Sequence, residues 1–106
     1  MSAPSVLLVY ITCPAEAAPA LAEALVEARL AACVNLLPGV QSVYRWQGRV
    51  ERAAETLLIA KTSQARYPAL EQEVRKRHPY ELPEIVAVSV ECGLPAYLGW
   101  VEESLG

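Results

Sequence analysis

The sequence predicts one α+β domain in which two strand–helix–strand units are joined by a long β-hairpin. Three observations predict it. The chain opens with an apolar run of strand length, the pair Gln47-Gly48 separates two long strand-like segments, and a helical pattern precedes a second, shorter apolar run. Such units form a four-stranded antiparallel sheet with two helices on one face, the ferredoxin-like split βαβ sandwich. A chain of 106 residues can close one such core, so we expect residues 1–106 to form a single domain.

The first unit starts with residues 5–12 (SVLLVYIT), an almost unbroken run of apolar and β-branched residues typical of a central strand buried on both faces. Pro14 ends this strand, and proline is favoured in the first turn of a helix. We therefore predict a helix that begins with Cys13 as its cap and extends to about Leu30. Its core face is expected to carry Leu21, Leu25 and Ala28.

A bent second strand is predicted from Ala32 to Trp46, because Pro38-Gly39 interrupts its apolar pattern with a turn or bulge. After a tight turn, residues 49–62 return as a third strand. The outer half of this hairpin is too polar to lie on the core, yet it carries Tyr44 and Trp46. We expect another surface to cover these two aromatic rings.

The second unit holds a helix that Ser63 is expected to cap, with basic residues 75–77 near its C-terminal dipole and Pro79 at its end. Residues 85–90 then form the fourth strand. The chain closes with an amphipathic helix whose apolar side is predicted to consist of Leu94, Tyr97, Leu98, Val101 and Leu105.

Hydrophobic residues make up 54% of the chain against 20% charged residues, a high apolar content for one small domain. In the usual strand order of this fold the second strand lies at a sheet edge, where an apolar unpaired strand is an aggregation hazard. The hairpin is also longer than one small sheet can use. We therefore expect closed self-association through strand edges.

Charge and hydropathy exclude two classes of partner. The formal net charge is −3 and the only basic cluster is residues 75–77, so no nucleic-acid binding is expected. No apolar stretch approaches the roughly 20 residues that span a bilayer, and the N-terminus lacks the pattern of a signal peptide. We expect a cytoplasmic protein that contacts no membrane.

The three cysteines, Cys13, Cys33 and Cys92, are an odd number with no close pair, which argues against disulfides and CxxC zinc sites. Cys33 and Cys92 lie in or just after predicted strands, where a cysteine is usually an inert small hydrophobe. Cys13, at a predicted helix N-terminus, is expected to have a lowered pKa, which makes it the best thiol for a soft metal. The alternative is that Cys13 is a small buried residue.

The only histidine, His78, lies where a basic helix end meets the acidic residues Glu81 and Glu84. A metal or a proton would be handled at this place in the chain. A hydrogen-bonding cap at the helix end is an equally good interpretation. The sequence leaves both open.

Three segments together resemble the CutA family of divalent-cation tolerance proteins: ARLAACVNLLPGVQSVYRWQG (28–48), AETLLIAKT (54–62) and HPYELPEI (78–85). The step Cys13-Pro14 and the closing AYLGWVEESL are also similar, so the resemblance covers nearly the whole chain. It implies a tight homotrimer similar to the PII signalling proteins, built through the extended hairpins, and a cytoplasmic location in bacteria. It also implies a link to copper and other divalent cations.

For copper, the resemblance implies ligands at Cys13 and at two successive histidines, which correspond to Arg77 and His78 here. Arginine stays charged and cannot coordinate a metal, so one ligand is missing. We therefore expect copper or another divalent metal to bind weakly, through Cys13 with help from His78.

The same motifs supply a polar and aromatic set for a ligand cleft: Tyr44, Trp46, Lys61, Arg77, Tyr80, Glu81 and Glu84. Packing between subunits is the favoured interpretation of Tyr44 and Trp46, because interfaces are rich in such residues. Lys61 directly follows an apolar strand segment and is expected to contact an anion or to pair with Glu81 or Glu84.

Three functions of different classes remain. The first is a trimeric regulatory protein that binds a divalent cation or a small ligand at clefts between subunits. The second is an anchoring trimer that holds an unidentified partner protein. The third is an acid–base enzyme that uses His78 with Glu81 or Glu84. No nucleophile motif, phosphate loop or cofactor fingerprint supports the third, so we favour the first and expect no enzyme activity.

Overall fold

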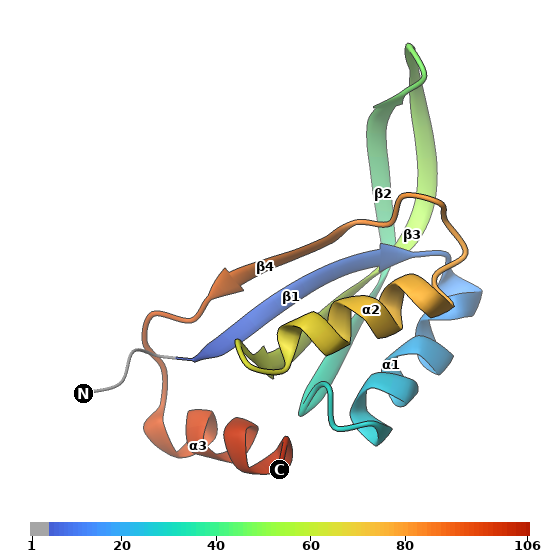
Figure 1. The fold of residues 1–106 in the computed structure, drawn as a ribbon. Coiled ribbons are helices and arrows are strands. Elements are labelled where there is room, and N and C mark those ends of the chain that lie inside the picture. The colour runs from blue at the N-terminus through green and yellow to red at the C-terminus, as the bar shows by residue number, and fades with distance from the viewer. Residues whose placement is uncertain (1–4) are drawn as a thin grey trace.

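The computed structural model describes residues 5–106 and has the predicted ferredoxin-like α+β fold (Figure 1). Its four antiparallel strands form one sheet in the order β2-β3-β1-β4, which confirms the edge position of the second strand. The strands are β1 (Val6–Cys13), β2 (Cys33–Trp46), β3 (Arg49–Ser63) and β4 (Ile85–Ser89). The helices are α1 (Ala18–Glu27), α2 (Tyr67–Arg77) and α3 (Pro95–Ser104), with a 3-10 turn at Ala15–Ala17.

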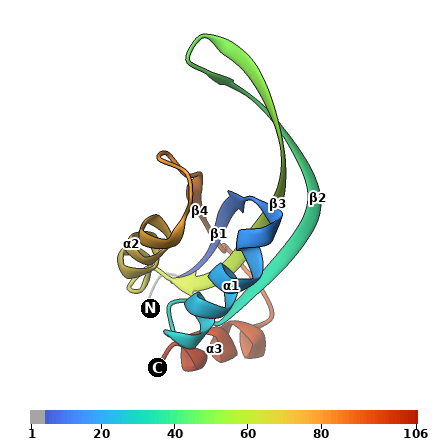
Figure 2. The same cartoon turned by 90° about the vertical axis from the view of Figure 1, so that its right-hand side faces the viewer.

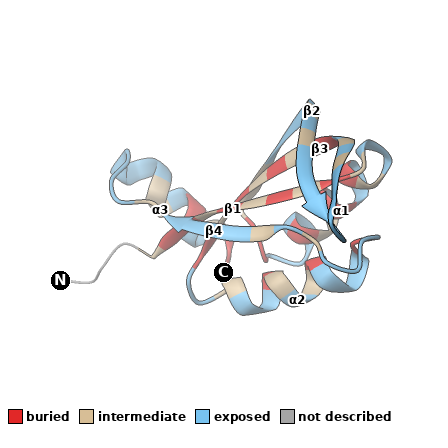
Figure 3. Cartoon of the chain, turned by 90° about the horizontal axis from the view of Figure 1, so that it is seen from above, coloured by how far each residue is buried: buried red, intermediate tan, exposed pale blue. Residues whose placement is uncertain are grey.

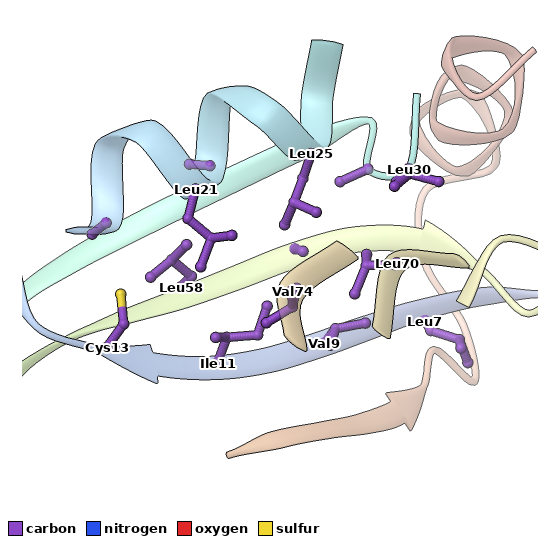
Figure 4. Packing of buried hydrophobic residues seen from close by; sticks show 14 residues of the cluster. Leu7, Val9, Ile11, Cys13, Leu21, Leu25, Leu30, Leu58, Leu70 and Val74 are labelled. Atoms are coloured by element: carbon purple, nitrogen blue, oxygen red, sulfur yellow. The ribbon is translucent and has the colours of Figure 1, made fainter. Parts of the chain in front are cut away.

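The main core lies between the sheet and the pair α1 and α2, which cover one of its faces (Figure 4). Alternate residues of β1 point to this side, so Val9 and Ile11 are fully buried beside Leu58 of β3. Leu25 from α1 and Leu70 from α2 complete the contact. Burying each such side chain contributes about 1.5–3 kcal/mol, so the two helices hold this half of the sheet in place.

The third helix packs separately, through a smaller cluster built around Val6, Val101 and Leu105. Leu98 lies beside this cluster and completes a stripe at spacings of three and four. Of the predicted apolar side, Leu94 and Tyr97 are exposed instead. Leu94 is the residue before the helix and is not part of its first turn. No helix within residues 5–106 is long and apolar enough to cross a membrane.

The connection after β1 differs from the sequence prediction. Cys13 is the last residue of β1 and not a helix cap, because its pairing with β3 outweighs the local signal for a helix start. Pro19, rather than Pro14, lies in the first turn of α1. The helix ends at Glu27, so Ala28 is exposed instead of facing the core.

The turn before α2 differs in a similar way. Ser63 is the last residue of β3, and its Oγ accepts a hydrogen bond from the Arg66 backbone N–H at 3.1 Å. The helix itself starts at Tyr67, with Pro68 in its first turn. Ser63 therefore shapes the turn but does not cap the helix.

The hairpin of β2 and β3 projects beyond the rest of the molecule and arches in Figure 2. β1 accompanies β3 only as far as Thr56, so residues 40–55 of the two strands pair only with each other within the described chain. Figure 3 shows this projecting part and β4 as largely exposed. The projecting half is a two-stranded ribbon with no helix behind it.

Both predicted backbone irregularities of the hairpin are present. The register between β2 and β3 shifts between Leu37 and Val40, where Gly39 has a φ of 79°. At the tip, Gln47 and Gly48 have φ values of 49° and 80°. Two successive left-handed residues match the twist of a two-residue hairpin turn, which explains why a glycine stands at its second position.

The sheet face opposite α1 and α2 is covered only at one end, where α3 packs on Val6. The rest of this face, called the open face below, carries apolar side chains that are half-buried or exposed. They are Leu8, Tyr10, Leu37, Ile59, Val86 and Val88. A monomer rarely leaves such a continuous apolar surface in water, so the open face is suited to contact with another protein surface.

Candidate functional site

A cleft of about 720 Å³ opens between the projecting half of the hairpin and the loop that follows α2. The hairpin supplies Tyr44 and Trp46, and the loop supplies Tyr80, Glu81 and Glu84. Five residues of the predicted ligand set, distant in sequence, therefore line one concavity. Its size is in the range of sites for small molecules.

The floor of the cleft contains a carboxylate that is almost completely buried. Glu55 is 6% exposed and lies on β3, one residue beyond the last pairing with β1. The Tyr80 hydroxyl donates a hydrogen bond to its Oε2 at 2.9 Å. No fully buried side-chain polar atom within residues 5–106 lacks a partner, so Oε1, which has none there, is open to the cleft. Burial and then the Glu55 carboxylate raise the pKa of Tyr80 to about 12, so this phenol remains a donor over the physiological range.

His78 holds the loop in place behind this pair. It is 7% exposed, and its Nε2 lies 2.7 Å from the Thr12 carbonyl oxygen. The Tyr80 backbone N–H donates to its Nδ1 at 3.1 Å, and the two rings pack with centroids 4.8 Å apart. These contacts require Nε2–H as the donor and Nδ1 as the acceptor. The geometry therefore matches the interpretation of His78 as a hydrogen-bonding cap after α2.

The Cys13 thiol lies in the hydrophobic core, beside Ile11 and Leu58 in Figure 4. It is 0% exposed. Burial, followed by the nearby negative charges of Glu55 and Glu16, raises the pKa of Cys13. The expected lowering of this pKa is therefore wrong, because Cys13 ends a buried strand and does not stand at a helix N-terminus.

The residues present do not fit the copper site that the family resemblance implies. Both ring nitrogens of His78 are already hydrogen-bonded, and the Cys13 thiol is buried. The Arg77 guanidinium pairs with Glu73 at 2.5 Å on the exposed side of α2. Within residues 5–106, no group of three or more His, Cys, Asp or Glu side chains is close enough to hold a metal ion.

Lys61 does not belong to the cleft. Its Nζ hydrogen-bonds to the Asn35 side-chain oxygen and lies 3.6 Å from the Cys33 sulfur, at the far end of the open face. Glu84 instead lies near Thr12, whose hydroxyl is 3.4 Å from its carboxylate. The predicted ion pair of Lys61 with Glu81 or Glu84 is therefore wrong, because the strand register places Cys33 opposite Lys61.

The sequence did not indicate Glu55, which is the most deeply buried polar residue that lines the cleft. Arg45 and Thr12 also line it and were not predicted. One signal was available for Glu55: it stands where a polar strand segment changes to the apolar run LLIA. That signal marks a boundary of the core, but it does not reveal which aromatic residue will reach the carboxylate.

The chain matches, over residues 7–104, the model of the family described as CutA1 divalent ion tolerance protein. The protein CutA of Mus musculus is 48% identical over 100 residues, which are 93% of this chain and 56% of the mouse protein. The chain thus spans about half the length of that relative. The divalent-cation tolerance protein CutA of Thermus thermophilus is 49% identical over 100 residues, covering 93% of this chain and 97% of that protein.

Solved structures of the same kind share the fold. The divalent cation tolerance protein (Cut A1) from Thermus thermophilus superposes with a TM-score of 0.93 at 48% identity, covering 95% of this chain and 99% of that one. A protein from Nostoc sp. described as PII-like protein CutA superposes with a TM-score of 0.89 at 36% identity, covering 94% and 97%. The similarity therefore extends over nearly the whole domain, including the projecting hairpin.

Proposed function

Because this chain belongs to the CutA1 family of divalent ion tolerance proteins, we propose that it regulates divalent-cation tolerance as a ligand-binding homotrimer. The family assignment confirms the resemblance found in the sequence motifs. The ligand site of the proposal is the cleft under the hairpin. The buried Glu55 carboxylate, held by Tyr80 and lining that cleft, is the observation that supports it most.

A homotrimer accounts for two surfaces that one chain leaves uncovered. The open face exposes Val86 and Val88, and the projecting half of the hairpin exposes Val50. A two-stranded ribbon is marginally stable in water on its own, so it gains from contact with another copy. A closed ring of three copies covers these surfaces on every chain alike.

Light scattering with one charged substitution tests the assembly. Val88→Glu places a carboxylate in the open face, so we expect the particle mass to fall from three chains to one. Val26→Glu is the matched control, because Val26 is 42% exposed on α1 and Val88 is 49% exposed on β4. A trimeric Val88→Glu protein, or an unsubstituted protein that is monomeric at micromolar concentration, would contradict the proposal.

The proposed role is recognition and regulation, without catalysis, in the cytoplasm. Copper is expected to bind weakly at most, because the Cys13 and His78 pair is not arranged as a metal site. Calorimetric titration with copper, zinc and magnesium chloride checks this directly. The small ligand in the cleft, rather than the metal, is then the signal that the trimer responds to.

Trp46 provides a direct test of ligand binding in the cleft. The chain has two tryptophans, and Trp100→Phe leaves Trp46 as the only fluorescent indole. Trp100 lies on α3 and does not line the cleft, so the variant keeps the site intact. We expect at least one member of a panel of small cations, anions and neutral compounds to change the Trp46 emission with saturation. An emission unchanged by every compound would refute the ligand site.

A second candidate function is an anchoring trimer that holds a partner protein. α3 favours it, because Leu94, Tyr97 and Trp100 are exposed and the two aromatic rings lie 5.6 Å apart. Capture from a lysate with the trimer, compared with a Tyr97→Ser and Trp100→Ser variant, distinguishes anchoring from ligand sensing. Partners retained by both proteins would speak against α3 as the docking surface.

A further inference from the structure

We propose that the ligand of the cleft is an organic ammonium ion, bound between the Glu55 carboxylate and the aromatic rings of Tyr44, Trp46 and Tyr80. This inference rests on the proposed function, because it names the chemical class of the ligand for the same cleft. It follows from the charge of the cleft, from the spacing of its carboxylates and from the rings that line it.

The charge of the cleft favours a cation. Three carboxylates line it, those of Glu55, Glu81 and Glu84, against the single guanidinium of Arg45. The ion pairs formed within residues 5–106 both belong to Glu73 on α2, so neither Arg45 nor these carboxylates is paired there. An unneutralised acidic cleft attracts positive ligands and repels anions.

Glu55 gives this charge a fixed position. Its side chain is more than nine-tenths buried and lines the cleft, with Oε2 held by the Tyr80 hydroxyl and Oε1 without a hydrogen bond from the described chain. Burying a carboxylate costs free energy unless it is paired or hydrogen-bonded. Because no fully buried polar atom within residues 5–106 lacks a partner, the unbonded Oε1 is open to the cleft, where it can accept a hydrogen bond from a ligand N–H or lie close to a cationic head group.

The spacing of the carboxylates argues against a bare metal ion. No group of three or more potential ligand side chains within residues 5–106 converges on one point. A cleft of about 720 Å³ is also far larger than a coordinated ion requires. The cleft that the acidic residues line is of molecular size, which suits a cation whose charge is spread over a bulky organic group.

The aromatic residues supply the second half of the recognition. Tyr44 and Trp46 stand two apart on β2 and so point to the same side of the strand, while Tyr80 approaches from the loop after α2. In the single chain all three residues are exposed, and all three line the cleft. The face of an aromatic ring attracts a cation through its quadrupole, and quaternary ammonium groups are commonly recognised by sets of such rings.

The test uses two probes of one shape, choline and its neutral carbon analogue 3,3-dimethylbutan-1-ol, titrated into the unsubstituted trimer by calorimetry. We expect choline to bind at least tenfold more tightly than the alcohol, and Trp46 emission in Trp100→Phe to follow the same curve. Because this arm needs no substitution in the cleft, it is independent of any folding defect. Equal affinity for the two probes, or tighter binding of the alcohol, would overturn the inference.

The Glu55→Gln variant tests which carboxylate is responsible. It keeps the shape of the side chain and removes its charge, so the preference for choline over the alcohol should fall to less than threefold. Glu103→Gln removes an exposed carboxylate on α3 and should retain the full preference. A full preference in Glu55→Gln, with a particle mass unchanged from that of the trimer, would overturn the role of Glu55.

The outcome also separates this inference from the proposed function. If Trp46 responds to anions or neutral compounds but not to choline, the cleft is a ligand site and the ammonium assignment is wrong. If Trp46 responds to no compound of any class, the ligand site and the ammonium assignment both fall. If choline binds and the particle is not a trimer, the ligand assignment stands and the assembly is wrong.

Discussion

The two halves of the long hairpin are built from the same two strands but lie in opposite environments. In the inner half, β3 pairs with β1 and lies under α1 and α2, and Leu58 is 0% exposed. In the outer half, β2 and β3 have only each other, and Val50 is 63% exposed. The inner half is therefore stabilised by burial within one chain, whereas the outer half depends on whatever contacts it from outside.

Glu55 marks the boundary between the two halves. β1 ends opposite Thr56, so Glu55 is the first residue of β3 without a partner on that side. The loop after α2 reaches this point, where Tyr80 bonds the carboxylate and His78 ties the loop to Thr12. The candidate site thus forms where the sheet covered by helices gives way to the two-stranded ribbon. At this boundary a polar side chain can be fixed by hydrogen bonds and still be accessible to a ligand.

The largest effect is expected from truncating the inner half. Leu58→Ala removes a fully buried side chain and should lower the free energy of unfolding by about 2–5 kcal/mol. Val50→Ala in the outer half should lower it less, because this side chain is exposed within one chain and packs only where another copy covers it. Urea denaturation of both variants at one protein concentration measures the difference. Equal losses would show that the assembled trimer buries the outer half as completely as the core.

His78 allows the boundary itself to be tested. His78→Ala leaves the Thr12 carbonyl and the Tyr80 N–H without their partners, so we expect a loss of about 1–3 kcal/mol in the free energy of unfolding. The neighbouring Arg77→Ala, on an exposed side chain, should change it by a few tenths of a kcal/mol. Thermal unfolding compares the two. A stable His78→Ala protein would favour a ligand role over the structural one.

The ionisation of Tyr80 at high pH is expected to lower the free energy of unfolding, by less than the substitutions above. Its pKa of about 12 in the folded protein lies above the ordinary value of 10, so ionisation favours unfolding. The contribution of the protonated Tyr80 phenol to the free energy of unfolding is complete below about pH 10 and is lost as the pH rises through about 12. Ultraviolet titration should show a late tyrosine step that Tyr80→Phe removes. If that step is present in the variant, it belongs to another tyrosine.

The smallest effect is expected outside both halves, at Arg77. The family resemblance implies a histidine there, yet the Arg77 guanidinium bonds Glu73, whereas the His78 ring contacts the Thr12 carbonyl oxygen. Arg77→His should therefore change copper affinity less than about twofold, the same as Arg75→His on the same helix end. Side-by-side calorimetric titrations at one pH check this. A tenfold gain for Arg77→His alone, about 1.4 kcal/mol, would revive the copper site.

Local patterns in the sequence predicted the order of the elements, the bulge at Gly39 and the turn at Gln47-Gly48. Each depends on features within a few residues: apolar periodicity, proline and glycine positions, and the φ values that a tight turn requires. The edge position of β2 followed from the usual strand order of the fold. The family motifs added the cleft residues Tyr80, Glu81 and Glu84.

Only the tertiary structure decided the chemistry of the individual groups. Cys13 has a raised pKa and not a lowered one because pairing with β3 extends the strand into the core. Lys61 contacts Asn35 because of strand register, and Glu55 meets Tyr80 because a loop 25 residues away folds onto it. The burial, partners and pKa values of side chains depend on which distant segments pack together, and no short pattern along the chain contains that information.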